Sequence, residues 1–266
     1  MKSVRNRSII GVVSDPTRYK VFILAAGLGT RLRPLTESVP KVMMPIEGDR
    51  PILEHTIQLL KDQGFRRFVV NTHYLGEKII SYFKDGRGLG VEISYSHEPE
   101  VALDTAGALK HASHLLSDDF LLLYGDELHF FDFAPALEFH EREKPIATVI
   151  LKRSAYPQEG DVVEIDRTTS RVIGWRGRPH DVHAYGEKMF LNSGLYVLSK
   201  NILDYIPKGL PVKLDGEIFP KLIKDNARIY GYVTDDDILD IGTPENYERA
   251  KRWYREKKAS RAKKHR

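Results

Sequence analysis

One continuous stretch, from Val21 to Pro45, constrains this chain more than any other part of it. The stretch opens with Val-Phe-Ile-Leu, an apolar run with β-branched members that predicts a buried strand. The strand passes into Ala25-Ala-Gly-Leu-Gly-Thr30, where small side chains leave the backbone N–H groups accessible. A loop of this kind, placed at the end of a buried strand, can bind phosphate.

The residues that follow the loop form a basic segment with several prolines. Its charged residues are Arg31, Arg33, Glu37 and Lys41, and its prolines are Pro34, Pro40 and Pro45. Because proline removes a backbone donor and clashes with the preceding turn, the segment cannot form a long helix. We therefore expect a semi-rigid cationic segment beside the phosphate loop.

The spacing of the glycines excludes two common phosphate-binding loops. A P-loop has Lys and then Ser or Thr directly after its last glycine, whereas Gly29 is followed by Thr30-Arg31. A dinucleotide-binding fingerprint needs a third glycine at the position of Leu32. What remains is the pattern G-x-G-T-R, followed ten residues after the arginine by Lys41.

Strands and helices alternate in the first half of the chain, which predicts an α/β fold. Strands are expected at 21–24, 68–71, 91–95 and 120–124, and helices at 52–60, 75–83 and 105–115. Such alternation predicts a mainly parallel sheet with helices on both faces and with ligands beyond the carboxyl ends of the strands. The phosphate loop and Asp126 both lie at that edge.

The second half is richer in strands. We expect strands at 147–151, 161–165, 171–175 and 189–198, and helices at 216–224 and 245–257, the last starting at Pro244. These strands are expected to extend the sheet and to form a second wall over the cleft.

Composition limits the class of protein. There is no cysteine, so disulfides and thiolate chemistry are excluded, in agreement with a cytoplasmic protein. No apolar run is long enough to cross a membrane, and the apolar run near the amino terminus is too short for a signal peptide. Residues 1–19 are treated as an amino-terminal extension, and the sequence does not say what they do or whether the chain forms a homo-oligomer.

The net charge of +4 comes from one end of the chain. Residues 251–266 contain nine Lys or Arg and a single acid, so the rest of the chain is acidic. We expect residues 255–266 to be a basic, frayed tail rather than a nucleic-acid-binding element.

The stretch G-x-G-T-R followed by Pro-Lys41-Val-Met-Met-Pro resembles the sugar-1-phosphate nucleotidyltransferases, and the resemblance covers residues 20–254. It implies a Rossmann-like three-layer sandwich with a mostly parallel mixed sheet and a sugar-binding lobe. It also implies the reaction of an NTP with a sugar 1-phosphate to give an NDP-sugar and pyrophosphate. No hexapeptide repeats occur at the end of the chain, so we expect a short form without the β-helix domain of some relatives.

The chemistry implied by the resemblance brings two polyanions together. A phosphate monoester is largely a dianion at neutral pH, so no general base is required. The site instead needs cations and a divalent metal ion to neutralise the phosphates, together with in-line placement. The resemblance assigns Arg31 and Lys41 to the phosphates and Asp126 to catalysis.

The resemblance also indicates a metal pair. Asp126 ends a buried strand in Leu-Leu-Leu-Tyr-Gly-Asp, and Asp240 lies in Leu-Asp-Ile-Gly-Thr-Pro-Glu, which resembles the second aspartate segment of the family. Mg²⁺ prefers one or two carboxylates together with phosphate oxygens and water. We therefore expect Mg²⁺, or Mn²⁺ in its place, at Asp126 and Asp240; the alternative is that each aspartate belongs only to a turn or a helix cap.

The nucleotide is expected at the loop and at a second segment, 98–107. The candidate residues are Leu24, Ala25, Ala26, Gly27, Gly29, Thr30, Arg31, Glu98, Asp104 and Gly107. Relatives commonly have Gly-Thr-Ala-Gly at the end of the second segment, and here Asp104 replaces the first glycine. An aspartate could accept hydrogen bonds from guanine or cap the helix that starts at Thr105.

The sugar phosphate is expected against the second half. The candidate residues are Gly160, Arg178, Asn192 and Glu217. Asn192-Ser-Gly-Leu-Tyr resembles the N-x-G-x-Y turn of the family, whereas Arg-Gly-Arg178-Pro stands in place of the usual Glu-Lys-Pro. Arg178 keeps the positive charge but the carboxylate is lost. Glu217 is a weaker candidate, and the alternative is that it is only a glutamate in the first turn of a helix.

The sequence leaves the base and the sugar open, and a guanylyltransferase acting on mannose or heptose 1-phosphate is the first choice. A uridylyl- or thymidylyltransferase acting on another sugar 1-phosphate is the next alternative. A third is a regulatory subunit that binds nucleotide sugars without catalysis.

Overall fold

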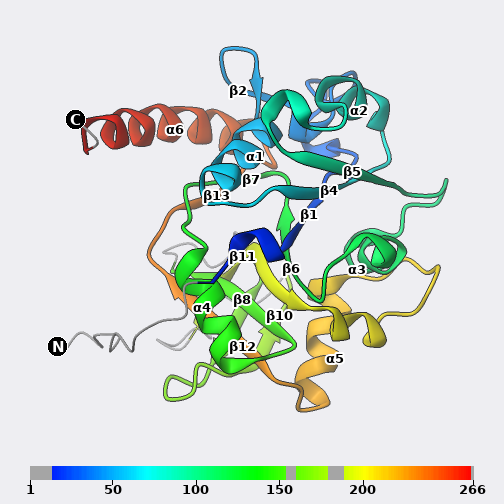
Figure 1. Cartoon of the computed structure of the whole chain (residues 1–266), viewed down its shortest axis with the longest axis vertical. Helices are drawn as coiled ribbons and strands as arrows, with labels where there is room; N and C mark the ends of the chain where they lie inside the picture. Colours follow the sequence, from blue (N-terminus) through cyan, green and yellow to red (C-terminus); the bar gives the residue numbers. More distant parts are fainter. Residues whose placement is uncertain (1–13, 154–159, 179–188, 265–266) are drawn as a thin grey trace.

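The computed structural model of this protein describes residues 14–153, 160–178 and 189–264. A nine-stranded sheet lies at its centre (Figure 1). Its strands are β1 Lys20–Leu24, β4 Arg67–Thr72, β5 Glu92–His97, β6 Asp119–Tyr124, β8 Ala147–Lys152, β9 Val162–Ile165, β10 Val172–Arg176, β11 Met189–Ser199 and β12 Ile229–Thr234. The order is β10-β9-β11-β6-β1-β4-β5, and β8 pairs with both β11 and β12.

The sheet is mixed but most of its strands run the same way. β1 is parallel to β4 and β6, β4 is parallel to β5, and β8 is parallel to β12. Because β11 is antiparallel to both β6 and β8, it runs against these strands and joins the two groups. The predicted α/β fold with a mostly parallel mixed sheet is confirmed.

Helices cover both faces of the sheet, which gives three layers. They are α1 Ile52–Asp62, α2 Gly76–Phe83, α3 Asp104–His111, α4 Ala134–Glu143, α5 Phe219–Lys224 and α6 Pro244–Lys264. Alternating side chains of a strand point to opposite faces, and in β1 Val21 and Ile23 pack with α1, α2 and α4 whereas Phe22 packs with α3 and α5. Each face therefore has its own apolar core.

Every strand and helix expected from the sequence is present, with ends shifted by a few residues, but the sequence missed six of the strands and helices in the described residues. They are α4, β12, and the short strands β2 Pro45–Glu47, β3 Arg50–Pro51, β7 Glu127–His129 and β13 Ile238–Asp240. β2 pairs with β3, and β7 pairs with β13 as a separate antiparallel ribbon, with Asp240 opposite Glu127. A strand of three residues is too short to show a periodic pattern in the sequence. The partner of β7, moreover, lies more than a hundred residues further along the chain.

A third, smaller apolar cluster fixes the basic segment. Leu32 and Met44 of that segment pack with Leu128 of β7 and with Tyr247 and Tyr254 of α6. Short 3₁₀ turns at Thr30–Leu32 and Lys41–Met43 replace a long helix, as the prolines predict. The basic segment is thus held between the β7–β13 ribbon and α6.

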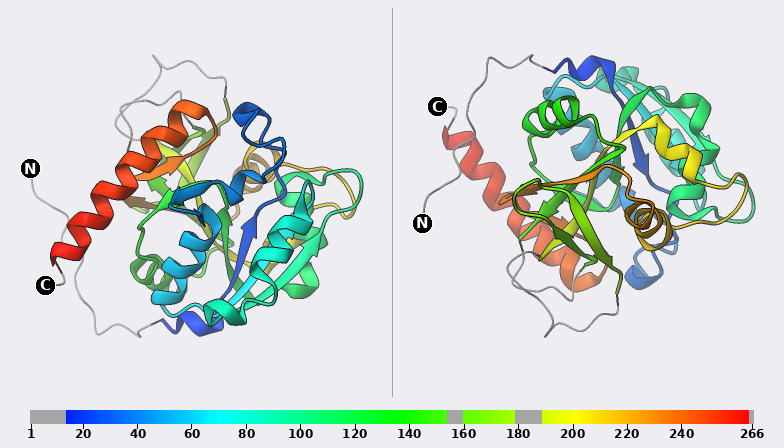
Figure 2. Two further views of the ribbon diagram at one scale, coloured as in Figure 1. Left: turned by 90° about the horizontal axis from the view of Figure 1, so that it is seen from above. Right: turned by 90° about the horizontal axis from the view of Figure 1, so that it is seen from below.

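The ends of the domain differ from the expected boundaries. Helix α6 is continuous to Lys264, so the basic tail that was expected to begin at residue 255 is part of a helix whose carboxyl-terminal end extends away from the body (Figure 2). Residues 1–13 of the expected extension lie outside the described residues, but Ser14 and Tyr19 both donate hydrogen bonds to Glu141 of α4, each 2.9 Å long. In the described parts of the chain, none of the helices has the length and apolar character needed to cross a membrane.

Candidate active site

Three neighbouring strands end at the same level, and two cavities open beside their ends. Leu24 at the end of β1 is opposite Asn71 of β4 and Tyr124 of β6. The smaller cavity, of about 340 Å³, lies against the loop after β1, and the larger, of about 910 Å³, lies against β11 and the β7–β13 ribbon. Carboxyl ends of strands are where ligands bind in folds of this kind. Both cavities are lined by Asp104, Thr105, Tyr124 and Asp126.

The point where the cavities meet carries one cation between two carboxylates. The ammonium of Lys41 forms an ion pair with Asp126 Oδ2 and lies 3.5 Å from Asp240 Oδ1. The side chain of Lys41 is 10% exposed and each carboxylate is 27% exposed. Burial lowers the pKa of Lys41, but the two carboxylates more than offset this, so the pKa is raised above its usual value and the lysine stays charged.

The β7–β13 ribbon creates this arrangement. It places Asp126, which directly precedes β7, beside Asp240 at the end of β13, and the backbone N–H of Ile241 donates to Asp126 O at 3.2 Å. Gly242 follows, and a Cβ there would lie 2.7 Å from both Arg31 Nη2 and Asp240 Oδ2. A larger residue would collide with both groups, so the glycine lets the Arg31 guanidinium and the Asp240 carboxylate lie close to the backbone at position 242.

The expected phosphate-binding residues are divided between the two cavities. Leu24, Ala25, Ala26, Gly27 and Lys41 line the smaller cavity. Arg31, which the sequence grouped with the nucleotide, lines the larger cavity. Gly29 and Thr30 line neither cavity in the part of the chain that the structure describes.

Buried hydrogen bonds fix the wall of the smaller cavity. Asn71 Oδ1 accepts the backbone N–H of Ala25 at 2.6 Å, and its amide donates to Glu98 Oε1. The other carboxylate oxygen of Glu98 accepts the N–H of Leu103 at 2.7 Å. Glu98 lines the cavity but is only 3% exposed, so in this structure its carboxylate ties the loop to the 98–107 segment.

Asp104 lines both cavities and begins helix α3 with a φ of 59°. This left-handed conformation is natural for glycine and tolerated by aspartate, which explains how Asp can occupy a position where relatives commonly have glycine. Its Oδ1 accepts the N–H of Thr105 at 2.8 Å. Gly107, in contrast, packs against the carbonyl of Leu210 on the buried side of α3 and lies outside both cavities.

The larger cavity contains three of the four residues expected at the sugar phosphate: Gly160, Arg178 and Asn192. The fourth, Glu217, is exposed, lies outside this cavity and accepts the backbone N–H of Lys213 at 2.9 Å, as a helix-capping residue does. The structure therefore favours the capping alternative for Glu217 over the sugar contact.

A hydrogen-bonded network that the sequence did not reveal forms the floor of the larger cavity. Asn192 donates to the hydroxyl of Tyr196 at 2.7 Å, and Tyr196 donates to Asp215 Oδ1 at 2.8 Å. Tyr124 donates to the other oxygen of Asp215. Burial raises the pKa of Asp215 to about 6, although the two tyrosine donors act in the opposite direction.

Two further charged residues of the larger cavity, Glu127 and Lys152, were also missed. Burial raises the pKa of Glu127 to about 8, against the lowering effect of the Lys152 ammonium. Lys152 donates to the carbonyl of Ile238 in β13. Asp126 is followed directly by an acid, and this adjacency is the one sequence clue that could have drawn attention to Glu127.

The carboxylates at the junction fit a magnesium site. Asp126 and Asp240 face a common point, which is occupied by the Lys41 ammonium, so a cation is stabilised there. Among the described residues no group of three or more His, Cys, Asp or Glu side chains could enclose a metal ion. Mg²⁺ is suited to two carboxylates, because it takes its other ligands from phosphate oxygens and water.

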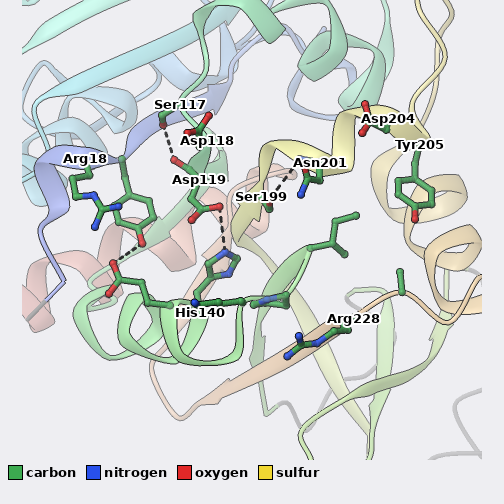
Figure 3. Close-up of a pocket in the computed structure, with 16 residues that line it drawn as sticks. Arg18, Ser117, Asp118, Asp119, His140, Ser199, Asn201, Asp204, Tyr205 and Arg228 are labelled. Carbon is green, nitrogen blue, oxygen red and sulfur yellow. Dashed lines mark hydrogen bonds and ion pairs between the residues drawn. The ribbon is translucent and has the colours of Figure 1, made fainter. Parts of the chain in front are cut away.

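A cavity of about 970 Å³ lies at the opposite edge of the sheet, where β6 begins and β11 ends (Figure 3). Its lining is charged, but the buried groups already have partners. His140 pairs through Nδ1 with Thr148 Oγ1 at 2.8 Å and lies 3.9 Å from Asp119, and Glu141 accepts from Tyr19. This cavity includes none of the expected site residues, so the site is assigned to the carboxyl edge.

Comparison with known proteins decides the family. Residues 20–257 match the Nucleotidyl transferase family. The chain belongs to this family. It is 36% identical to the UTP–glucose-1-phosphate uridylyltransferase of Synechocystis, covering 86% of this chain and 61% of that protein.

Two further relatives have different names. The mannose-1-phosphate guanylyltransferase of Mycobacterium tuberculosis is 34% identical, with 85% of this chain and 62% of that protein covered. HddC from Yersinia pseudotuberculosis, solved as a complex with GMP-PN, is 26% identical with a TM-score of 0.74, over 89% of this chain and 99% of HddC. This nucleotidyl transferase domain thus spans about three fifths of the length of the two curated relatives.

Proposed function

We propose that the protein condenses an NTP with a sugar 1-phosphate and releases an NDP-sugar and pyrophosphate. The observation that carries this proposal is the Lys41 ammonium between the carboxylates of Asp126 and Asp240, at the junction of two cavities. The smaller cavity would hold the nucleotide and the larger the sugar phosphate. The junction is then the place where the phosphates of both substrates meet.

The residues at the junction suit phosphate transfer without a general base. In this proposal a sugar phosphate oxygen attacks the α-phosphorus of the NTP, forming one P–O bond while the bond to pyrophosphate breaks. The attacking phosphate is largely a dianion already, so charge neutralisation is the main requirement. Lys41 and Arg31 would neutralise phosphate oxygens, and Mg²⁺, or Mn²⁺, bound at Asp126 and Asp240 would supply further positive charge.

The proposed function explains why Lys41 forms an ion pair with the two aspartates. Two carboxylates this close repel each other unless a cation lies between them. With metal and phosphate bound, the carboxylates would hold the divalent ion and the ammonium would pair with phosphate oxygens. The same three side chains thus have partners before and after binding, which avoids an unpaired buried charge.

GTP with mannose or heptose 1-phosphate is our first choice of substrates. The guanylyltransferase of M. tuberculosis and the GMP-PN complex of HddC support a guanine nucleotide, and Asp104 at the smaller cavity supplies a carboxylate that can accept from guanine. A uridylyl- or thymidylyltransferase is the second candidate, supported by the 36% identity to the Synechocystis uridylyltransferase.

A matrix of substrates tests the proposal. Each of GTP, UTP, dTTP, ATP and CTP would be combined with mannose, glucose and heptose 1-phosphates at saturating Mg²⁺, and pyrophosphate release would be followed. We expect release with one dominant pair, best with GTP, and none when the metal is chelated. Binding of an NDP-sugar without pyrophosphate release for any pair would instead support the regulatory subunit.

A further inference from the structure

Glu127 has a buried carboxyl oxygen without a partner. Its Oε2 is buried and has no hydrogen-bond partner among the residues that the structure describes. Leaving a buried acceptor unpaired is costly, so such a group in a native protein is expected to meet a donor from a ligand, an ion or water. Glu127 lines the larger cavity and not the smaller one, so a ligand in the larger cavity can supply the missing donor.

The position of Glu127 relates it to the sugar phosphate cavity rather than to the metal pair. It lies opposite Asp240 in the β7–β13 ribbon, yet Asp126 and Asp240 contact Lys41 and Glu127 forms no ion pair with that lysine. A Cβ at Gly194 would lie 3.2 Å from Glu127 Cγ. The Glu127 side chain therefore lies beside Gly194 of β11, and Asn192 of the same strand lines the same cavity.

The chemistry of the carboxyl group selects the part of the ligand that it can bind. The phosphate of a sugar 1-phosphate is largely a dianion without a hydrogen to donate, so it cannot supply the donor that Glu127 Oε2 lacks. A sugar hydroxyl both donates and accepts, so it can pair with a carboxyl oxygen. Two of the cations that line the same cavity, Arg31 and Arg178, suit the phosphate instead.

We propose that Glu127 is a specificity-determining residue, which accepts a hydrogen bond from a ring hydroxyl of the sugar 1-phosphate. This inference rests on the proposed function of the site. Glu127 would then make the protein discriminate between sugar 1-phosphates that differ in one hydroxyl. A site that is built to pair with a hydroxyl discriminates strongly against an analogue that lacks it, because the buried partner is left unsatisfied.

A double-mutant cycle between protein and substrate tests the inference. Wild type, Glu127→Gln and Glu127→Ala would be assayed with the best sugar 1-phosphate and with its monodeoxy analogues, at fixed NTP and Mg²⁺. For wild type, loss of one hydroxyl should reduce kcat/KM about tenfold or more. Glu127→Ala should not distinguish this analogue from the parent sugar, and its KM for the NTP should be unchanged.

Controls separate this role from a structural one. Glu92→Gln, an exposed carboxylate on β5 at the far edge of the sheet, should behave as wild type with every sugar. Thermal unfolding identifies a variant that fails to fold, and Glu127→Gln, which keeps the shape of the side chain, then serves as the test variant. Glu127→Gln should discriminate less than wild type.

Three outcomes would contradict the inference. Variants that distinguish every deoxy analogue as wild type does would overturn it while leaving the proposed function intact. So would variants with an unchanged KM for the sugar phosphate but a raised Mg²⁺ requirement, since Glu127 would then act on the metal. If wild type releases no pyrophosphate with any sugar phosphate, the proposed function itself is wrong and the inference falls with it.

Discussion

The two cavities at the carboxyl edge of the sheet are built in different ways. The smaller one is enclosed by the loop after β1 and the segment 98–107, and its buried polar groups, Asn71 and Glu98, are paired with each other and with backbone N–H groups. The larger one contains Glu127, with an unpaired buried oxygen, and Asp215, whose pKa burial raises to about 6. Asn71 and Glu98 of the smaller cavity have hydrogen-bond partners, whereas Glu127 Oε2 of the larger cavity has none among the described residues.

This difference indicates how each cavity would bind its ligand. A cavity whose polar groups are already paired accepts a ligand mainly by shape and by the few groups left over, such as Asp104. A cavity with unsatisfied or strained ionisable groups binds a ligand that completes them. We therefore expect substitutions in the larger cavity to change the choice of sugar, and substitutions in the smaller one to change nucleotide binding and stability.

The largest effect is expected at Asp126, which belongs to both cavities. Asp126→Asn removes a charge that pairs with Lys41 and that would bind Mg²⁺, so kcat should fall about 10³-fold and half-maximal activity should need more metal. Metal titrations of the steady-state rate measure both. Asp235→Asn, at an 88% exposed acid paired with Arg153, is the matched control. Unchanged metal dependence in Asp126→Asn would remove this residue from the site.

Arg31 tests which cavity receives the leaving pyrophosphate. Arg31→Ala should lose at least about 3 kcal/mol of transition-state stabilisation, or roughly a hundredfold in kcat/KM. If the guanidinium holds the triphosphate, as the sequence predicts, the KM for the NTP should rise more than the KM for the sugar phosphate. A larger rise in the KM for the sugar phosphate would instead assign Arg31 to the sugar phosphate, whose cavity it lines. Arg87→Ala, at an 88% exposed arginine, should match wild type.

Asp215 should give the larger cavity a characteristic pH dependence of stability. Because burial raises its folded-state pKa from 3.8 to about 6, the folded protein binds this proton more tightly than the unfolded chain. The contribution of protonated Asp215 to the unfolding free energy is fully present below pH 3.8 and is lost as the pH rises through 6. Relative to wild type, Asp215→Asn should gain about 3 kcal/mol in unfolding free energy between pH 3.8 and 7. Denaturant unfolding at several pH values measures this, and a difference that does not vary with pH would show that Asp215 is not buried as an acid.

The smallest effect is expected from the wall of the nucleotide cavity. Asn71→Ala leaves the Ala25 N–H and Glu98 Oε1 without partners, so unfolding free energy should fall by about 2 kcal/mol. The KM for the NTP should rise while the KM for the sugar phosphate stays the same. Gln58→Ala, which removes an exposed hydrogen bond to Asp62, is the control. An equal rise in both KM values would mean that the two cavities are not independent.

A second group, His129, also makes the unfolding free energy depend on pH, and its effect must be separated from that of Asp215. Burial lowers the pKa of His129 to about 3, so this histidine is neutral in the folded protein. The contribution of neutral His129 to the unfolding free energy is lost as the pH falls from the usual histidine pKa of 6.5 towards 3. This pH dependence is opposite in direction to that of Asp215. Comparing Asp215→Asn with wild type at each pH cancels the histidine, because both proteins contain it.

The sequence by itself determined the local features. The apolar run before the small-residue loop predicted β1, the prolines predicted the short turns of the basic segment, and Pro244 marked the start of α6. The alternation of strands and helices predicted the fold and the edge at which the site lies. These features depend on residues that are close together in the chain, where periodicity and backbone chemistry act directly.

Only the tertiary structure decided how the site is assembled. The ribbon of β7 and β13 brings Asp240 beside Asp126, Gly242 lets Arg31 approach, and the fold places Asp215 beneath two tyrosines from different strands. It also placed Glu217 outside the cavity and brought Glu127 into it. Such contacts join residues separated by up to two hundred positions, and no local pattern encodes them, because packing and charge pairing between distant segments decide which side chains meet.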